Sequence, residues 1–312
     1  MRRMFLLAVT CLPVLAFGQA AEPTQSTPQV LSAPGNEPPM LGLHWERGFH
    51  PNVRANDANA AGFARSRRSP NMTYHGGKIL ITTVTENIFW GTSWPTYTGD
   101  KITGLDSWYT GFNFSNYATT SDEYTGTNGQ VTDTTTHKGF VIDSSPSASG
   151  NNTTTILNEV CKVITSPDPS GNGYYAVYTD TPRGSNNYCA YHSVGTCHGV
   201  TVQFAYFFKL DGDAGCDPQD TSGLHSQGLA ALANVSGHEL SEARTDPASP
   251  GAWYDSSGQE NGDKCAWTFN VPLVTFSNGT KWKIQGEWSN AAYTAGTGYP
   301  NSSGQRGCLA GQ

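Results

Sequence analysis

The stretch Val235-Ser-Gly-His-Glu-Leu-Ser-Glu-Ala-Arg-Thr-Asp-Pro247 decides which fold this chain can adopt. It lies at the end of the longest predicted helix, from Ser222 to about Arg244. Pro247 disfavours helical geometry at Asp246, so we expect the helix to end at that residue or just before it. Apolar residues recur in this segment at helical spacing, although two glycines weaken the pattern: Leu224, Leu229, Leu232, Val235 and Leu240.

Three polar side chains of this helix form a pattern that is typical of metal sites. Residues four apart lie on one helix face, about 6 Å apart along the axis, so His238 and Glu242 could bind one ion together. Glu239 would point to the side of that pair, where it could hold a water molecule and accept its proton. The His-Glu-x-x-His pattern of zinc proteases works in this way. Here Glu242 stands where the second histidine usually stands.

A third ligand has to come from outside this pair. The segment from Trp253 to Cys265 is rich in carboxylates and turn residues, and it can fold back over the helix. Within it, Glu260 is the predicted third ligand, and Asp263 is predicted to bond the outer nitrogen of His238. Asp246 would lie about 12 Å further along the axis if the helix continued, so it could replace a ligand only after a sharp turn.

The motif and its neighbours also have simpler interpretations. The same five residues occur by chance in solvated acidic helices with a lone histidine, and aspartates in this segment are common turn and capping residues. A calcium site built from Asp255, Glu260 and Asp263 is a further alternative, because Ca²⁺ prefers oxygen ligands. Zn²⁺ accepts a carboxylate too, but the added negative charge of Glu242 weakens zinc as a Lewis acid and favours other divalent ions.

Residues 1–20 have the features of a secretory signal peptide. Arg2 and Arg3 form a basic start, the run from Phe5 to Phe17 is apolar, and Gly18-Gln19-Ala20 offers a cleavage context. The run is too short for a stable membrane anchor, so we expect a secreted protein, extracellular or periplasmic. Without the two arginines the formal charge changes from −7 to −9, which argues against nucleic acid as a partner.

Of the seven cysteines, Cys11 falls in the signal segment, and the even number that remains predicts disulfides. Cys189 and Cys197 are close enough in sequence to close a small loop, so this is the first pairing we expect. The alternative is metal ligation by thiolates, since His192 and His198 lie among the cysteines, although no Cys-x-x-Cys pair exists.

Residues 21–70 are predicted to be a disordered lead-in or a pro-segment, because much of this stretch is Pro-rich or small and polar. Arg65-Ser66-Arg67-Arg68 marks either a protease-sensitive junction at its end or a solvated loop. Residues 71–312 are predicted to form one α+β domain. Its expected strands lie at 78–90, 139–142, 174–178, 201–208, 267–276 and 281–288, and its expected helices at 153–164 and 222–244.

Four further motifs follow one another along the chain: Tyr74-His75-Gly76-Gly77-Lys78-Ile79-Leu80, Ile88-Phe89-Trp90-Gly91, Ala252-Trp253-Tyr254 and Glu260-Asn261-Gly262-Asp263-Lys264-Cys265. Together they resemble the phosphate-induced protein 1, or EXORDIUM-like, family over roughly residues 72–310, in its microbial branch with a His-Glu-x-x-Glu helix. Plant members of that family are secreted cell-wall proteins linked to growth. The resemblance implies a zincin-like domain with a mixed sheet, a late metal-type helix and a turn-rich, disulfide-stabilised C-terminal segment. The chain departs from the zincin peptidases in two ways. It has Glu242 at the position of the second histidine, and it lacks a Gly-x-x-His continuation after the helix.

Two functions from different classes are predicted. The first is a secreted zinc metallopeptidase that acts on proteins or peptides, with Glu239 as general base and His238, Glu242 and Glu260 as ligands. The second is a non-catalytic extracellular protein that binds cell-wall polysaccharide or a surface partner, in which the helix is a relic or holds a structural ion such as Ca²⁺. Three other residues are weaker site candidates, for which structural roles are favoured: His75, His192 and Glu287.

Overall fold

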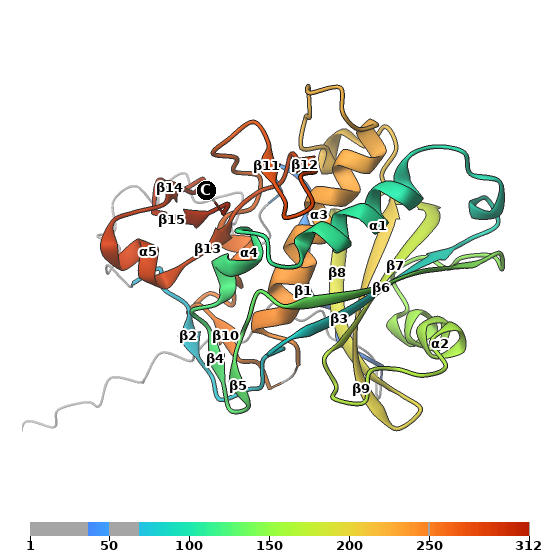
Figure 1. Cartoon of the computed structure of the whole chain (residues 1–312), viewed down its shortest axis with the longest axis horizontal. Helices are drawn as coiled ribbons and strands as arrows, with labels where there is room; N and C mark the ends of the chain where they lie inside the picture. Colours follow the sequence, from blue (N-terminus) through green and yellow to red (C-terminus); the bar gives the residue numbers. More distant parts are fainter. Residues whose placement is uncertain (1–36, 50–68, 249, 312) are drawn as a thin grey trace, which may run out of the picture.

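A mixed six-stranded sheet lies at the centre of the fold (Figure 1). In spatial order its strands are β1 (Leu41–Trp45), β8 (Tyr188–Cys197), β9 (Val200–Lys209), β7 (Gly173–Pro182), β3 (Thr83–Trp90) and β6 (Thr135–Asp143). The last four run parallel to one another, whereas β8 is antiparallel to β9 and β1 is antiparallel to β8. The computed structural model describes residues 37–49, 69–248 and 250–311. The predicted signal peptide and the Arg65–Arg68 cluster lie outside these residues.

Helices cover both faces of this sheet (Figure 1). α1 (Lys101–Phe112) and α3 (Gln227–Thr245) lie on one face, and α2 (Thr153–Val163) lies on the other. Successive side chains of a strand point to opposite faces, and β8 shows the division. Its Gly195 lies against Leu157 of α2, whereas His192 points toward Glu242 of α3. The prediction of an α+β fold with a mixed sheet is confirmed.

α3 is a buried helix from its first turn to its last. Its N-terminus is capped by Ser226, whose side chain accepts a hydrogen bond from the Leu229 amide at 3.2 Å. All residues from 228 to 245 are buried, so the interpretation of the motif as a solvated helix face is wrong. The helix ends before Asp246, as Pro247 predicts. It begins later than expected, and Leu224 ahead of it is 57 % exposed.

The predicted elements agree with the structure where an apolar period is strong. The strands expected at 139–142, 174–178 and 201–208 and the helix at 153–164 all form. β8 and α1 are not predicted. In α1 the helical pattern is interrupted by Gly104, and the structure explains this residue, because a Cβ there would lie 2.4 Å from Leu229 of α3. The segments expected as strands at 267–276 and 281–288 form only two-residue pieces.

The remaining elements of the described residues are short. They form two-stranded pairs, one three-stranded sheet, two short helices and three 3-10 turns. Their bounds are β2 (Thr73–Tyr74) with β10 (Trp253–Tyr254), β4 (Thr125–Gly126) with β5 (Gly129–Gln130), β11 (Val274–Thr275) with β12 (Lys281–Trp282), β13 (Glu287–Trp288) with β15 (Arg306–Leu309) and β14 (Tyr299–Pro300), α4 (Asn261–Lys264), α5 (Asn290–Ala295), Trp94–Thr96, Ala118–Ser121 and Ala214–Cys216.

The folded domain begins earlier than residue 71. β1 lies within the segment that the sequence assigns to a lead-in or pro-segment, yet it forms the edge strand of the main sheet. Leu41 and Leu43 of this strand are buried in the core. The sequence hides this strand because its apolar run is short and the residues before it are rich in proline.

Three disulfides link distant parts of the fold: Cys161–Cys197, Cys189–Cys216 and Cys265–Cys308. The predicted pairing of Cys189 with Cys197 is wrong, because both residues lie in β8, where eight steps along an extended strand separate them by roughly 26 Å. All six cysteines are used in disulfides, so thiolates are not available as metal ligands. Disulfides persist in oxidising compartments, and their presence agrees with an exported protein.

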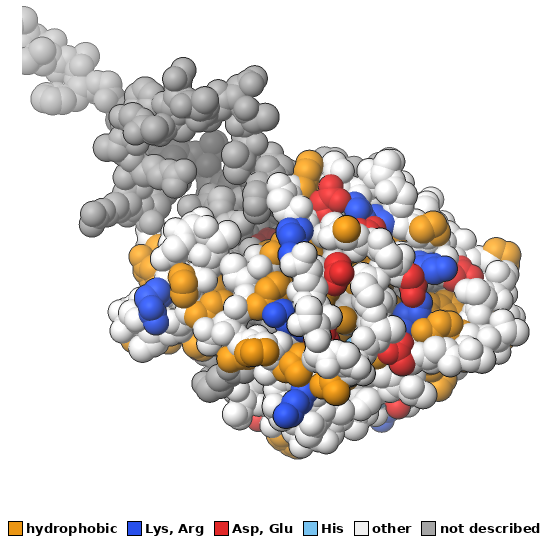
Figure 2. All heavy atoms as spheres, turned by 90° about the horizontal axis from the view of Figure 1, so that it is seen from above, with side chains coloured by type: hydrophobic (Ala, Val, Ile, Leu, Met, Phe, Trp, Pro, Cys, Tyr) orange, Lys and Arg blue, Asp and Glu red, His pale blue; other side chains and the backbone are white. Residues whose placement is uncertain are grey.

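The surface carries few charges and no large field of one sign on the face drawn in Figure 2, where acidic and basic side chains are scattered among uncharged ones. This matches the 14 % of charged residues in the sequence. Within residues 37–49, 69–248 and 250–311, no helix combines the length and the apolar character needed to cross a membrane.

The Cys265–Cys308 bridge should contribute strongly to stability because it closes a loop of 43 residues. Replacing both cysteines by serine is expected to lower the free energy of unfolding by about 3–4 kcal/mol, mainly by freeing the unfolded chain. Urea unfolding without reductant would measure the change. The paired variant of Cys161 and Cys197, with a separation of 36 residues, should lose a similar amount. An unchanged urea midpoint in either variant would contradict this account.

Candidate metal centre

α3 brings three polar side chains into the interior of the protein. His238, Glu239 and Glu242 each have 0 % of their surface exposed. Charged groups are costly to bury unless they are paired, hydrogen-bonded or bound to a metal. The question for each side chain is therefore which partner satisfies it.

The first group of side chains surrounds His238 Nε2. This nitrogen lies 3.0 Å from Glu242 Oε1 and 3.9 Å from Asp263 Oδ1. The Asp263 amide also donates a hydrogen bond to Glu242 Oε1 at 2.9 Å, which fixes that carboxylate relative to α4. One ligand atom from each of His238, Glu242 and Asp263 lies within 4.8 Å of the others, so the three could hold a metal ion.

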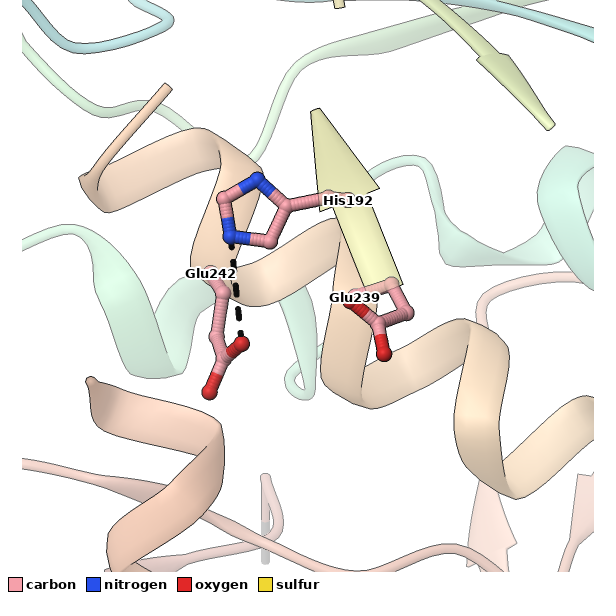
Figure 3. Close-up of side chains that lie close together, drawn as sticks. All are labelled: His192, Glu239 and Glu242. Carbon is pink, nitrogen blue, oxygen red and sulfur yellow. Dashed lines mark ion pairs between the residues drawn. The ribbon is translucent and has the colours of Figure 1, made fainter. Parts of the chain in front are cut away.

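A second group joins α3 to β8, and Figure 3 draws its three side chains, with the ring of His192 directed toward Glu242 and Glu239 to one side on α3. His192 Nε2 lies 3.9 Å from Glu242 Oε2 and 3.4 Å from Glu260 Oε2. Ligand atoms of His192, Glu239 and Glu242 also lie within 4.8 Å of one another. Glu242 therefore belongs to both groups, with Oε1 on the His238 side and Oε2 on the His192 side.

Several buried atoms of these groups have no hydrogen-bond partner within the part of the chain that the structure describes. A buried polar atom left unsatisfied costs about 1–3 kcal/mol, and more when it is charged. Such a concentration of unsatisfied polar atoms fits a bound cation. The atoms are both ring nitrogens of His192, His238 Nε2, both carboxylate oxygens of Glu239, Glu242 Oε2 and Glu260 Oε2.

Burial shifts the protonation of the whole cluster toward neutral forms. Desolvation lowers the pKa of His192 and of His238 to about 3, and it raises the pKa of Glu242 to about 8. Burial and then the charge of Glu242 raise the pKa of Glu239 and of Asp263 well above their usual range. At neutral pH the imidazoles are free to act as ligands, and either protons or a cation must balance the carboxylates.

Gln285 contacts His238 from the opposite side of the ring. Its Nε2 lies 3.0 Å from His238 Nδ1 and donates to the Gly262 carbonyl at 2.9 Å. In this orientation the imidazole proton sits on Nε2 and faces Glu242. A metal ion on Nε2 requires the proton on Nδ1, and therefore the Gln285 amide turned so that its oxygen accepts from Nδ1. That turn gives up the bonds of this amide to the Gly262 carbonyl and from the Trp267 amide. Gln285 is thus the residue that selects the tautomer of His238.

The predicted supporting carboxylates lie differently from the expectation. Asp263 faces Nε2 of His238 rather than the outer nitrogen, which Gln285 occupies. Glu260 lies beside His192. Asp246 stays outside both groups, because its carboxylate accepts a hydrogen bond from the Ala252 amide and closes the turn after α3.

The alternative calcium site does not form as predicted. Asp255 is engaged by Lys264 Nζ at 2.7 Å and by the Ser257 hydroxyl at 2.6 Å, so its oxygens are already used. Glu287, another weak candidate, accepts a hydrogen bond from the Tyr117 hydroxyl at 2.6 Å. Both acids have structural partners and lie outside the two groups of candidate ligands.

Sequence reasoning misses one residue at the centre and underrates another. His192 is a weak candidate by sequence, because nothing local shows that β8 lies against α3. His44 of β1 is missed entirely, yet its ring stacks on His238 with 4.0 Å between ring centroids and 8° between planes. In the stretch Leu41-Gly-Leu-His-Trp45, the only sequence features that point to a functional role are a glycine and a histidine inside an apolar run.

The centre is closed to solvent. His192, His238, Glu239 and Glu242 are 0 % exposed, and Glu260 is 1 % exposed. An open cleft of about 630 Å³ lies elsewhere on the molecule, lined by residues that include Asn116, Tyr299 and Arg306.

No protein-family model, curated protein or solved structure matches the chain.

A metal ion at this centre should depend strongly on His238. Replacing His238 by alanine is expected to weaken Zn²⁺ or Mn²⁺ binding by more than about 100-fold, because loss of a ligand exceeds the 10–100-fold effect of a residue that only supports one. Titration calorimetry would measure the affinity. His198→Ala is the matched control, since that exposed ring contacts the Cys161 carbonyl instead. Equal affinities in both variants would contradict the assignment.

Metal uptake at pH 7 should release protons. The pKa of Glu242, about 8, keeps this carboxyl largely protonated at pH 7, and a cation binds the deprotonated form. Affinity should therefore rise with pH until about pH 8 and then level off. Calorimetry at pH 7 in buffers with different ionisation enthalpies counts the protons released. A count of zero would show that Glu242 is not a ligand.

Proposed function

We propose that the protein is a secreted metal-dependent hydrolase of the metallopeptidase type, with Zn²⁺ as the first candidate ion. The observation that carries the proposal is Glu239, a fully buried glutamate that lies in the group with His192 and Glu242 and whose two oxygens make no hydrogen bond of normal geometry. A structural metal site does not need such a group, whereas a hydrolytic site needs a base next to its ion.

The geometry favours His238, Glu242 and Asp263 as the residues that would hold the ion. Their ligand atoms lie within 4.8 Å of one another, and this group leaves Glu239 free to act as a base. Asp263 then takes the place that the sequence gives to Glu260. When bound, a divalent ion would lower the pKa of a water molecule and polarise the carbonyl under attack. It would also favour the charged form of Glu239, against the burial that raises the pKa of this carboxyl.

The chain's own residues then supply the proton transfers. Glu239 accepts a proton as the water oxygen bonds to the carbonyl carbon, and it returns that proton to the leaving nitrogen as the C–N bond breaks. The products are a carboxylic acid and an amine. Neutral His192, with both ring nitrogens unpartnered, can donate an N–H to the oxygen on which negative charge develops. A helix with this motif beside a sheet with an antiparallel edge strand supports the zincin-like description.

A non-catalytic extracellular protein of the EXORDIUM-like type is the second proposal, in line with the sequence resemblance. The closed centre favours it, because buried side chains can hold a structural ion without admitting a substrate. Tyr74 of β2 is 40 % exposed and lies beside Trp253 of β10, with 5.4 Å between ring centroids. Paired aromatic rings of this kind suit stacking against a polysaccharide of the cell wall.

Replacing Glu239 by glutamine separates the two proposals. In a hydrolase this change should retain one ion per chain and lower the hydrolysis of casein by about 10²–10⁴-fold, the usual contribution of a general base. Elemental analysis and a casein assay measure both quantities. Glu86→Gln is the matched control, on a partly buried glutamate of β3, and should leave activity unchanged. A purified protein without a stoichiometric divalent ion would overturn the hydrolase proposal.

A further inference from the structure

β1 passes directly over the metal centre. Gly42 approaches it so closely that an added Cβ would lie 2.1 Å from Glu242 Oε2 and 2.4 Å from His192 Nε2. Its φ of +44° is also a conformation that favours glycine. The main chain of residues 41–43 therefore occupies the space in front of Glu242, where a scissile peptide group would have to lie.

The next polar residue of β1 covers the other histidine of the centre. His44 is fully buried between His238 and Trp267, with ring centroids 4.0 Å and 4.7 Å away. Neither ring nitrogen makes a hydrogen bond of normal geometry, although the Gln285 side chain is close enough to act on the pKa of His44. A residue that only completed the core would be better satisfied as an apolar side chain. The His44 ring instead shields the metal-binding face of the protein from water.

β1 lies on the one edge of β8 that faces the centre. It pairs antiparallel, with Leu41 opposite His192 and Trp45 opposite Tyr188, and the register is irregular on both sides of His44. The other edge of β8 is taken by β9. Without β1, the β8 edge beside His192 would present free main-chain donors and acceptors. Such an edge binds an extended polypeptide through main-chain hydrogen bonds.

The contacts that hold this segment resemble those of a bound peptide. Trp267 Nε1 donates to the Trp45 carbonyl at 2.9 Å, and Ser193 Oγ donates to the Pro39 carbonyl at 2.6 Å. Glu46 forms an ion pair with Arg183 at 2.7 Å. The rest of the sheet, from β8 to β6, is complete without β1, and no disulfide joins residues 37–49 to it.

We propose that the edge of β8 is the binding site for an extended polypeptide substrate, and that residues 37–49 occupy it as an internal inhibitory strand. This rests on the proposed function. The favoured substrate has glycine at the position facing Glu242, followed by an apolar residue and then a flat ring that fits between His238 and Trp267. The strand itself resists hydrolysis because the bend at Gly42 and the irregular pairing around His44 carry its peptide groups out of regular register.

The test is Gly42→Ala in the full chain, compared with Gly48→Ala. Both positions have positive φ, but a Cβ on Gly48 would meet nothing within 4 Å. In Gly42→Ala, hydrogen exchange of residues 188–194 should be at least 10-fold faster, and casein hydrolysis by the Zn²⁺-loaded protein should rise at least 10-fold. A synthetic peptide of residues 37–49 should bind to this variant and inhibit it. Gly48→Ala should behave as the wild type.

The outcomes distinguish this inference from the hydrolase proposal. If residues 188–194 stay protected, or if they are released and bind neither casein nor the peptide, the inhibitory strand is overturned. If they are released and bind the peptide, but the metal-loaded protein hydrolyses nothing, the polypeptide site stands and the hydrolase proposal falls. Should Gly42→Ala fail to fold, His44→Ala replaces it, because it uncovers His238 without backbone strain and should likewise raise hydrolysis at least 10-fold. No increase with a folded His44→Ala variant would also overturn the inhibitory strand.

Discussion

The complete burial of α3 is the constraint on which the rest of the structure depends. A helix with His238, Glu239 and Glu242 inside the protein has to balance their charge and satisfy their hydrogen bonds. The surroundings do this only in part: Asp263 and Gln285 meet some atoms, and others remain without partners. Ligand atoms of His192, Glu239 and Glu242, which join α3 to β8, lie within 4.8 Å of one another. A cation placed among them would satisfy one atom of each of these side chains together, which no single side chain could do.

This arrangement gives a physical role to the unusual residue of the motif. A second histidine at position 242 would offer one ligand nitrogen, directed to one side. Glu242 offers two oxygens, and they serve different neighbours: Oε1 faces His238 and the Asp263 amide, whereas Oε2 faces His192. The carboxylate therefore connects the helix to α4 on one side and to β8 on the other.

Local patterns in the sequence predict the helix and the direction of its side chains. Long-range pairing of strands decides which side chains from other elements reach the centre. The spacing of His238 and Glu242 and the position of Pro247 are enough to place the motif at the end of a helix. His192 reaches the centre only because β8 pairs with β9 in one register, which no local pattern reveals. Asp263 rather than Glu260 faces His238 because Asp263 Oδ2 also accepts from the Glu260 amide at the start of α4, a detail of local geometry that composition does not fix.

Gly262 and Gly42 approach Glu242 from opposite sides. The two segments that carry them are held differently, and this determines which segment could move away from the carboxylate. A Cβ on Gly262 would lie 3.0 Å from Oε1, and one on Gly42 would lie 2.1 Å from Oε2. Gly262 is held in α4, where Gln285 bonds its carbonyl and the Cys265–Cys308 bridge follows three residues later. Gly42 belongs to an edge strand that no disulfide restrains. If β1 moved, Oε2 and His192 would be uncovered and His238 would lose the ring of His44. The bond from the Asp263 amide to Oε1 and the contact of Gln285 with His238 involve no residue of β1, so they would still hold the residues proposed to bind the ion.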